Sequence, residues 1–181
     1  MRFPDTCLAI HGGYLRQLEA EHVNHSYVEG LNDPIVNKYL EVRHNVQTLG
    51  SVKEFVSANE EAEDGVLWGI WVDDQHRLIG SVRLHGIDLS KGDCHLGICI
   101  FDRCAWGKAL ASSSIKAVSR WAFYQFGLKK IYAGVDPKNV ASGKAFLKAG
   151  FEFVSRETSH SLIFGDTEQK GIFIAYPKFQ N

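Results

Sequence analysis

The middle of the chain carries the clearest hydrophobic pattern, and this pattern predicts strands. Val66 to Val72 is a run of β-branched and aromatic residues, and Arg77 to His85 follows after a short polar turn. Two such runs separated by turn residues are typical of an antiparallel hairpin. A third apolar run, Cys94 to Phe101, predicts the next strand, and the alternation of side chains along it places His95 and Cys99 on the same face.

Helical spacing of apolar residues appears on both sides of these strands. It extends from Ala109 to Phe126, and Gly127 predicts a C-terminal cap there. A shorter helix is predicted from Asn139 to Lys148, with the asparagine as its N-terminal cap. Between Ser51 and Glu63, a serine followed three residues later by Glu54 has the form of a capping box and predicts another helix.

The remaining elements have weaker patterns. Leu15, Leu18 and His22 have the spacing of one helix face. Further strands are expected at Lys129–Val135, Phe151–Arg156 and Ile172–Tyr176, with another candidate at Ser161–Gly165. The order of helices, strands, helix, strand, helix and strands predicts an α/β (α+β) domain built around one sheet.

Composition excludes several classes of protein. The 181 residues suit one domain, which we expect to span 1–181. A formal net charge of −1 argues against a nucleic-acid binder that relies on bulk positive charge. No run approaches the roughly 18 apolar residues of a membrane span, and no signal peptide is visible, so we expect a cytoplasmic protein with no membrane partner. The four cysteines lack C-x-x-C spacing, and we expect no metal site.

The stretch W-G-K-A-L-A, residues 106 to 111, lies between a predicted strand and a predicted helix. The first turn of a helix offers unpaired N–H groups to an anion. Gly107 would let the backbone approach that anion, Lys108 adds a positive charge, and Ala109 keeps the next position small. The turn therefore indicates a phosphate site, although close packing alone would also explain small residues. It matches neither a Walker A loop nor a G-x-G-x-x-G fingerprint.

A second stretch, N-V-A-S-G-K-A-F-L-K-A-G-F from Asn139 to Phe151, decides between these interpretations. Together with W-G-K-A-L-A, it resembles the GNAT superfamily of N-acetyltransferases. The resemblance is nearest to the branch with ribosomal-protein alanine acetyltransferases and bacterial amino-sugar acetyltransferases. It extends from about Asp33 to Phe151.

This resemblance implies a mixed, mostly antiparallel sheet in which two central parallel strands splay apart to hold acetyl-CoA. The pantetheine arm would pair with the first of these strands, the diphosphate would bind the turn, and the second motif would contact the lower part of the CoA. The cofactor residues implied are Ile98, Cys99, Ile100, Trp106, Gly107, Lys108, Ala109, Leu110, Ala111, Asn139 and Ser142.

The chain departs from the family pattern where many relatives have a tyrosine that protonates the leaving thiolate. Phe146 occupies that position and has no proton to give. Ser142 is therefore the better candidate for the general acid, and the alternatives are water or Tyr132. For the general base, His95 falls where many relatives carry a glutamate, and a histidine titrates near neutral pH. A structural role at the start of a strand would also explain His95.

Glu41 competes with His95 as the base, whereas Asp93 and His85 are weaker candidates. The spacing of the two histidines matches no common zinc signature.

The stretch Y-L-E-V-R falls where relatives form the acceptor pocket, and its residues Tyr39, Glu41 and Arg43 are the predicted substrate-binding residues. The first hypothesis is a small-molecule amine as acceptor, such as an amino-sugar nucleotide. The alternatives are the N-terminal α-amino group of a protein, as in the ribosomal-protein branch, and a non-catalytic CoA-binding module. The family resemblance implies a monomer or a homodimer.

Overall fold

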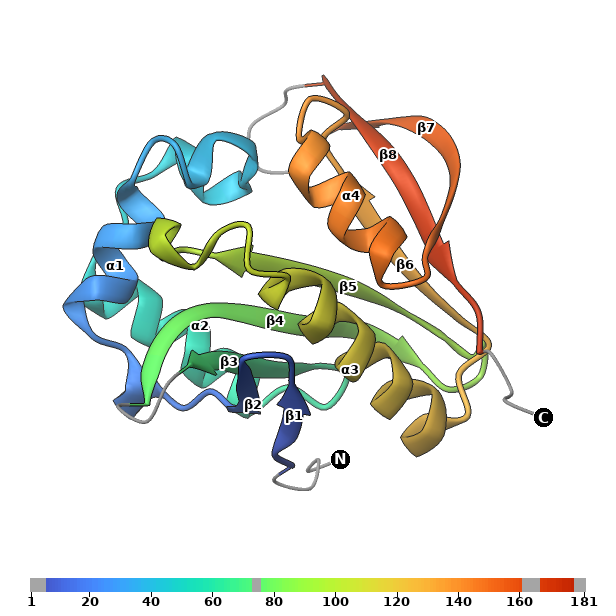
Figure 1. Ribbon diagram of the computed structural model, residues 1–181, viewed down its shortest axis with the longest axis horizontal. Coiled ribbons are helices and arrows are strands. Elements are labelled where there is room, and N and C mark those ends of the chain that lie inside the picture. The colour runs from blue at the N-terminus through green and yellow to red at the C-terminus, as the bar shows by residue number, and fades with distance from the viewer. Residues whose placement is uncertain (1–5, 73–75, 161–166, 178–181) are drawn as a thin grey trace.

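The computed structural model describes residues 6–72, 76–160 and 167–177. These residues form one eight-stranded sheet in the order β1-β2-β3-β4-β5-β6-β8-β7, with helices on both faces (Figure 1). Neighbouring strands are antiparallel except for β5 and β6, which are parallel. The predicted mixed, mostly antiparallel sheet with a central parallel pair is confirmed.

The strands that the apolar runs predicted are present. Their bounds are β3 (Val66–Val72), β4 (Arg77–Asp88), β5 (Asp93–Ile100), β6 (Lys130–Val135), β7 (Glu152–His160) and β8 (Thr167–Ala175). The first two of these form the predicted antiparallel hairpin. The further strand considered at Ser161–Gly165 lies outside the described residues.

Two short strands precede this set, β1 (Leu8–Ile10) and β2 (Gly13–Gln17), and the sequence did not predict them. The assignment of Leu15, Leu18 and His22 to one helix face was wrong. Leu15 lies on β2 opposite Ile70, and the Leu18 N–H donates to the Leu67 carbonyl at 3.0 Å. Pairing with β3 therefore outweighs the helical spacing of these residues.

The helices are α1 (His25–Asn32), α2 (Leu49–Glu60), α3 (Leu110–Phe126) and α4 (Val140–Lys148), with short 3₁₀ turns η1 (Ala20–His22), η2 (Asn37–Tyr39), η3 (Glu41–His44) and η4 (Arg103–Ala105). Asn139 caps α4 by accepting the Ser142 N–H at 3.1 Å, as predicted. Gly127 ends α3 with a left-handed φ of 62°, also as predicted.

Helix α2 begins earlier than the sequence suggested. Thr48 is its N-terminal cap, because the Thr48 hydroxyl accepts the Ser51 N–H and the Ser51 hydroxyl accepts the Thr48 N–H. The predicted box between Ser51 and Glu54 was therefore wrong by one helical turn. Helical spacing predicts Val52, Phe55, Val56 and Asn59 on one inner face; this is correct for Val52, Val56 and Asn59, which are buried, and wrong for Phe55, which is exposed.

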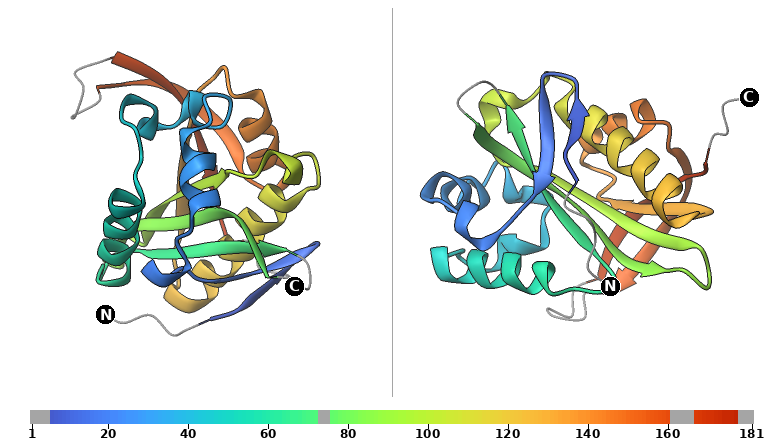
Figure 2. Two further views of the ribbon diagram at one scale, coloured as in Figure 1. Left: turned by 90° about the vertical axis from the view of Figure 1, so that its left-hand side faces the viewer. Right: turned by 90° about the horizontal axis from the view of Figure 1, so that it is seen from below.

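The two faces of the sheet are covered by different helices, as Figure 2 shows from below. Side chains of α3 and α4 pack with one hydrophobic cluster, and side chains of α1 and α2 pack with the other. Successive side chains of β5 point to opposite faces of the sheet, so this strand contributes to both hydrophobic clusters. Leu96 belongs to the α3–α4 side, whereas Cys99 and Phe101 face the α1–α2 side. Among the described residues, no helix is long and apolar enough to cross a membrane.

Strands β5 and β6 pair only over their first residues and then part. The pairs are Asp93 with Lys130, Cys94 with Ile131 and His95 with Tyr132. Figure 1 shows the two strands separating above this point, with α4 beside β6. The sheet is therefore open along one side of β5, at its C-terminal half.

Backbone groups of β5 face this opening. The Phe101 N–H donates to the Ile79 carbonyl of β4 at 3.0 Å. Because N–H and C=O groups alternate in direction along a strand, those of Ile98 and Ile100 point away from β4 and toward the gap. No strand pairs with them there.

Candidate active site

The turn between β5 and α3 leaves a row of backbone donors free. Gly107 and Ala109 both adopt left-handed conformations, with φ of 76° and 58°. The first backbone bond of α3 is donated by Ser113 to the Ala109 carbonyl, at 3.0 Å. In the described structure, the N–H groups from 107 to 112 have no acceptor. Such a row at a helix N-terminus is suited to bind an anion.

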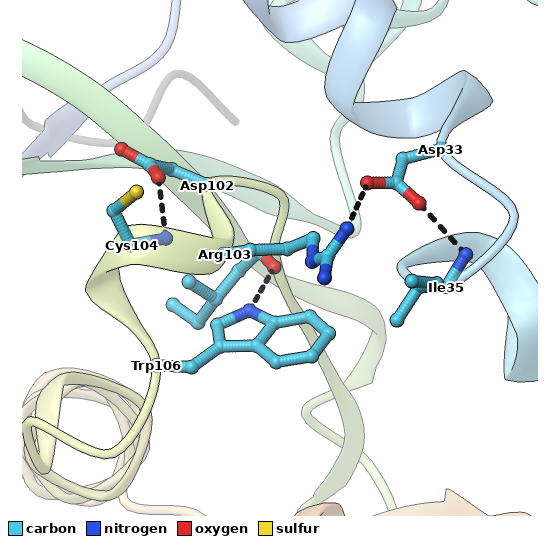
Figure 3. Close-up of polar contacts among 7 residues, drawn as sticks. Asp33, Ile35, Asp102, Arg103, Cys104 and Trp106 are labelled. Atoms are coloured by element: carbon cyan, nitrogen blue, oxygen red, sulfur yellow. Dashed lines mark hydrogen bonds and ion pairs between the residues drawn. The ribbon is translucent and has the colours of Figure 1, made fainter.

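Side chains hold this turn in place, as Figure 3 shows. The Asp102 carboxylate accepts the Cys104 N–H at 2.8 Å and also pairs with Arg77. The Trp106 Nε1 donates to the Ile100 carbonyl at 2.9 Å. The indole therefore ties the turn to the end of β5.

A second contact joins the turn to the end of α1. Arg103 Nη1 lies 3.3 Å from a carboxylate oxygen of Asp33, and the other oxygen accepts the Ile35 N–H at 2.8 Å (Figure 3). The Ile35 N–H, followed by Arg103, lowers the pKa of Asp33. Arg103 is thus engaged with Asp33 and braces the turn.

Next to this turn lies a cavity of about 560 Å³, called here the turn cavity. Every residue that the sequence analysis assigned to the cofactor lines it: Ile98, Cys99, Ile100, Trp106, Gly107, Lys108, Ala109, Leu110, Ala111, Asn139 and Ser142. Exposed ammonium groups surround its rim, from Lys38, Lys108, Lys144 and Lys148. The turn cavity combines free N–H donors with positive charge, so it is suited to a long, phosphate-bearing ligand.

A second cavity, of about 420 Å³, lies over the α1–α2 face of the sheet and is called the sheet cavity. It meets the turn cavity where β5 and β6 part. The residues lining both cavities are Tyr39, Leu40, Ile98, Cys99, Asn139 and Ser142. A molecule in the turn cavity and another in the sheet cavity would therefore meet at this junction.

The floor of the sheet cavity is formed by alternate residues of β4: Ser81, Arg83 and His85. The Tyr27 hydroxyl donates to the Ser81 oxygen at 3.2 Å, and burial raises the pKa of Tyr27 to about 12. The Arg83 guanidinium lies 5.6 Å from the centre of the Phe55 ring. Its Nε is buried without a hydrogen-bond partner in the described residues, and burial lowers the pKa of Arg83.

His85 is neutral at neutral pH. Burial, and then the nearby charges of Arg83 and His95, lower the pKa of His85 to about 4. Its Nδ1 is buried and finds no partner within the described parts of the chain. Burial therefore keeps the imidazole unprotonated and makes it a weaker base than an exposed histidine.

The other candidates for proton transfer lie at different places. His95 is exposed and lines neither cavity; its ring is stacked on His85 at 5.5 Å and lies 5.6 Å from Tyr132. Tyr132 also lies outside both linings. Ser142 is at the junction, and in the described structure its hydroxyl makes no hydrogen bond.

The predicted acceptor residues are separated by the fold. Tyr39 lines both cavities, and Glu41 lies at the rim of the sheet cavity, 3.2 Å from the Lys170 ammonium group. Arg43 does not line either cavity, and its guanidinium donates to the Leu40 carbonyl at 2.9 Å. Phe146 is buried against Phe151 and Phe173, as befits a residue with no polar role.

Most of the cavity floor was not predicted from the sequence. Ser81 and Arg83 were not selected, and His85 was ranked low. A signal was present, since S-V-R-L-H alternates polar and apolar residues and so places three polar side chains on one face of the strand. That this face lines a cavity depends on pairing with β5, which the sequence does not display.

The side chains in the described residues that lie close enough to hold a metal ion together are Glu19, Glu21 and His22. They line neither of the two cavities.

Comparison with known proteins agrees with this geometry. The family described as acetyltransferase (GNAT) domain matches residues 14–152. The uncharacterized N-acetyltransferase YoaA of Bacillus subtilis is 28% identical over 139 residues, covering 76% of this chain and 78% of that protein. The N-acetyltransferase-like protein YjcK of the same organism is 31% identical over 91 residues, which cover 50% of this chain and 50% of that protein.

Solved structures share the fold. A GNAT-family acetyltransferase from Bacillus anthracis has a TM-score of 0.78 at 18% identity, covering 94% of this chain and 98% of that one. A spermidine N-acetyltransferase from Vibrio cholerae, solved with CoA and spermine, has a TM-score of 0.75 at 20% identity, covering 90% and 94%. A Vibrio cholerae structure provisionally assigned as a ribosomal-protein-serine acetyltransferase has a TM-score of 0.75 at 18% identity, covering 96% and 99%.

Proposed function

The chain belongs to the GNAT acetyltransferase family and is an acetyl-transferring enzyme; we propose that it transfers the acetyl group of acetyl-CoA to the primary amine of a small molecule. Both substrates would be bound at once, one in each cavity. The observation that carries this proposal is the junction of the turn cavity and the sheet cavity at the gap between β5 and β6. We take residues 1–181 to act as one catalytic unit.

The residues of the turn cavity fit acetyl-CoA. The free N–H groups from 107 to 112 would bind its diphosphate. The Ile100 N–H would pair with an amide of the pantetheine arm, because β6 has parted from β5 at that level. An arm running along β5 from the turn would bring the thioester to Ile98 and Ser142, at the junction.

At the junction, three groups of this chain would serve the transfer. The Ile98 N–H would donate to the thioester oxygen, where negative charge develops. His85, which lines the sheet cavity, would accept the proton that the amine loses as its nitrogen bonds to the acetyl carbon. The Ser142 hydroxyl would donate to the sulfur as the C–S bond breaks, and solvent would replace its proton. Glu41 ranks second as the base because it lies at the rim of the sheet cavity. His95 ranks third because it does not line that cavity.

A small acceptor suits the sheet cavity, in which Tyr39 and Glu41 would contact it. An amino-sugar nucleotide remains our example of such an amine. The Glu41–Lys170 ion pair joins η3 and β8 across the rim, and it limits the space available to a larger substrate. Arg43 would have to leave the Leu40 carbonyl in order to reach the acceptor.

A second candidate is the N-terminal amine of a protein. The fold similarity to the structure provisionally assigned as a ribosomal-protein-serine acetyltransferase favours it. An extended peptide would have to displace the Glu41–Lys170 pair from the rim. Incubation with a cell lysate and labelled acetyl-CoA separates the two candidates: a labelled protein band supports the second, and label in small molecules alone supports the first.

The melting temperature with and without acetyl-CoA tests the cofactor site. At about 100 times the Kd, binding adds about 2.7 kcal/mol, which corresponds to a rise of roughly 5 to 10 °C for a chain of this length. Gly107→Glu should abolish the rise, because it places a carboxylate among the anion-binding N–H groups. Gly127→Glu is the matched control, since both glycines have positive φ and open space around a built Cβ. Release of free thiol in the presence of amines then tests the reaction itself.

A further inference from the structure

Arg83 is a cation on the floor of the sheet cavity without a carboxylate partner. Across the described residues, its guanidinium makes no hydrogen bond or ion pair, and its Nε is buried. The carboxylates of the same cavity are engaged elsewhere: Glu41 pairs with Lys170, and Asp136 accepts the Lys138 N–H. Asp64 acts on Arg83 only through its more distant charge.

An unpaired guanidinium at such a place is costly to bury, and the cost is recovered when an anion binds. The planar group of Arg83 lies over the Phe55 ring at 5.6 Å, which holds the group in one orientation. A fixed guanidinium offers two parallel N–H donors to a carboxylate or a phosphate, and it does so better than an ammonium group.

The space beside Arg83 is open. Arg83 lies opposite Gly97 in the β4–β5 register, and a Cβ built on Gly97 meets no atom within 4 Å. Gly97 also lines the sheet cavity and precedes Ile98, at the junction. A ligand lying over Gly97 would therefore reach Arg83 with one end and the junction with the other.

We propose that Arg83 binds an anionic group, a carboxylate or a phosphate, on the acceptor, so that the substrates of this enzyme are amines that also carry a negative charge. The proposal rests on the proposed function and makes it narrower. It also implies discrimination against polyamines, because a second ammonium group would meet Arg83 without an intervening anion.

Matched pairs of acceptors test this inference. The first pair is L-serine and L-serinamide, which differ in a carboxylate; the second is glucosamine 6-phosphate and glucosamine, which differ in a phosphate; spermidine is the polycation. For each, kcat and KM are measured with wild type, Arg83→Met, Arg83→Lys and the control Arg120→Gln, an exposed position on α3 outside both cavities.

We expect the wild type to prefer the charged member of at least one pair, and the pair that responds identifies the anion. Arg83→Met should raise KM for that member about 10- to 100-fold, with kcat little changed and the neutral member unaffected. Arg83→Lys should recover only part of the loss, because an ammonium group lacks the planar fork. Equal efficiency within both pairs, or equal loss on charged and neutral acceptors, would overturn the proposal.

Two further readouts keep this test independent of the proposed function. If acetyl-CoA raises the melting temperature of wild type and Arg83→Met alike but no amine is acetylated, the proposed function fails. Calorimetric titration of the same acceptors into the CoA-bound protein then decides the anion site. If wild type binds a charged member and Arg83→Met does not, the anion site is supported. If both bind it with equal affinity, the anion site is refuted.

Discussion

The Lys170 ammonium group donates to the Glu41 carboxylate at 3.2 Å, joining two positions 129 residues apart. One lies on η3 and the other on β8, and both line the sheet cavity. With relative exposures of 33% for Lys170 and 67% for Glu41, the pair is open to solvent, so its contribution to stability should be below about 1 kcal/mol. Its main consequence is geometric, because it holds the carboxylate at the rim.

The role of Glu41 can be tested by comparing the two partners. If His85 is the base, Glu41→Gln and Lys170→Met should both change acceptor KM and leave kcat within about tenfold of wild type. A catalytic carboxylate contributes about 100- to 10,000-fold. A loss of that size in kcat for Glu41→Gln alone would identify Glu41 as the base. Steady-state kinetics with saturating acetyl-CoA measures the difference, and chemical unfolding checks that both variants are folded.

Ala109 bears the strain of the turn between β5 and α3. Its φ of 58° is left-handed, which costs an L-residue roughly 1–2 kcal/mol relative to glycine. Ala109→Gly relieves this strain but loses about 0.5–1 kcal/mol through backbone entropy, so its stability should stay equal to wild type or rise by up to about 1.5 kcal/mol. Ala111→Gly, in the first turn of α3, has no such strain to relieve and should only lose stability. If urea unfolding shows that Ala109→Gly and Ala111→Gly lose equal amounts of stability, Ala109 is not strained.

Acid should destabilise the protein through His85. Its pKa is lowered from the ordinary 6.5 to about 4 in the fold. Between these values the unfolded chain binds a proton that the folded chain does not, so stability is complete above about pH 6.5 and falls as the pH is lowered toward 4. His85→Gln should flatten the pH dependence of the urea midpoint in this window. His25→Gln, at an exposed position on α1 away from His85, is the control, and a slope unchanged in His85→Gln would refute the shift.

The sequence predicted well those features of the fold that depend on neighbouring residues. Asn139 and Gly127 act on their own helix ends, so their caps could be recognised from neighbouring residues. The strand containing Leu15 could not, because it is short and is specified by pairing with β3. The N-terminal cap of α2 was predicted at Ser51 and lies at Thr48, because two overlapping residue patterns fit a capping box.

The candidate site also has a part that the sequence predicted and a part that it did not. Trp106 and its neighbours lie within one turn, and the sequence placed them together. Arg83 and Lys170 reach the sheet cavity from strands far apart in the chain, and only the registers of β4 with β5 and of β6 with β8 bring them there. Arg43 was expected in the cavity, but a nearby carbonyl holds its side chain, which a sequence pattern does not reveal.

The Ser142 hydroxyl should matter more for the chemical step than for cofactor binding. Its hydroxyl lies at the junction without an acceptor in the described part of the molecule, whereas its backbone N–H is fixed by Asn139. A hydrogen bond to a charged leaving group is worth about 1.5–3 kcal/mol, so Ser142→Ala should lower kcat about 10- to 100-fold when chemistry limits the rate. The rise in melting temperature with acetyl-CoA should be unchanged.

Ser26→Ala is a suitable control for Ser142→Ala, because Ser26 is exposed on α1 and lines neither cavity. Rapid-quench measurement of the first turnover reports the chemical step directly. If Ser142→Ala acetylates its acceptor at the wild-type rate, the serine is not the donor to the thiolate. Tyr132→Phe then separates the remaining donors: a loss of rate would require Tyr132 to move to the junction, since it lines neither cavity, and an unchanged rate leaves water as the proton source.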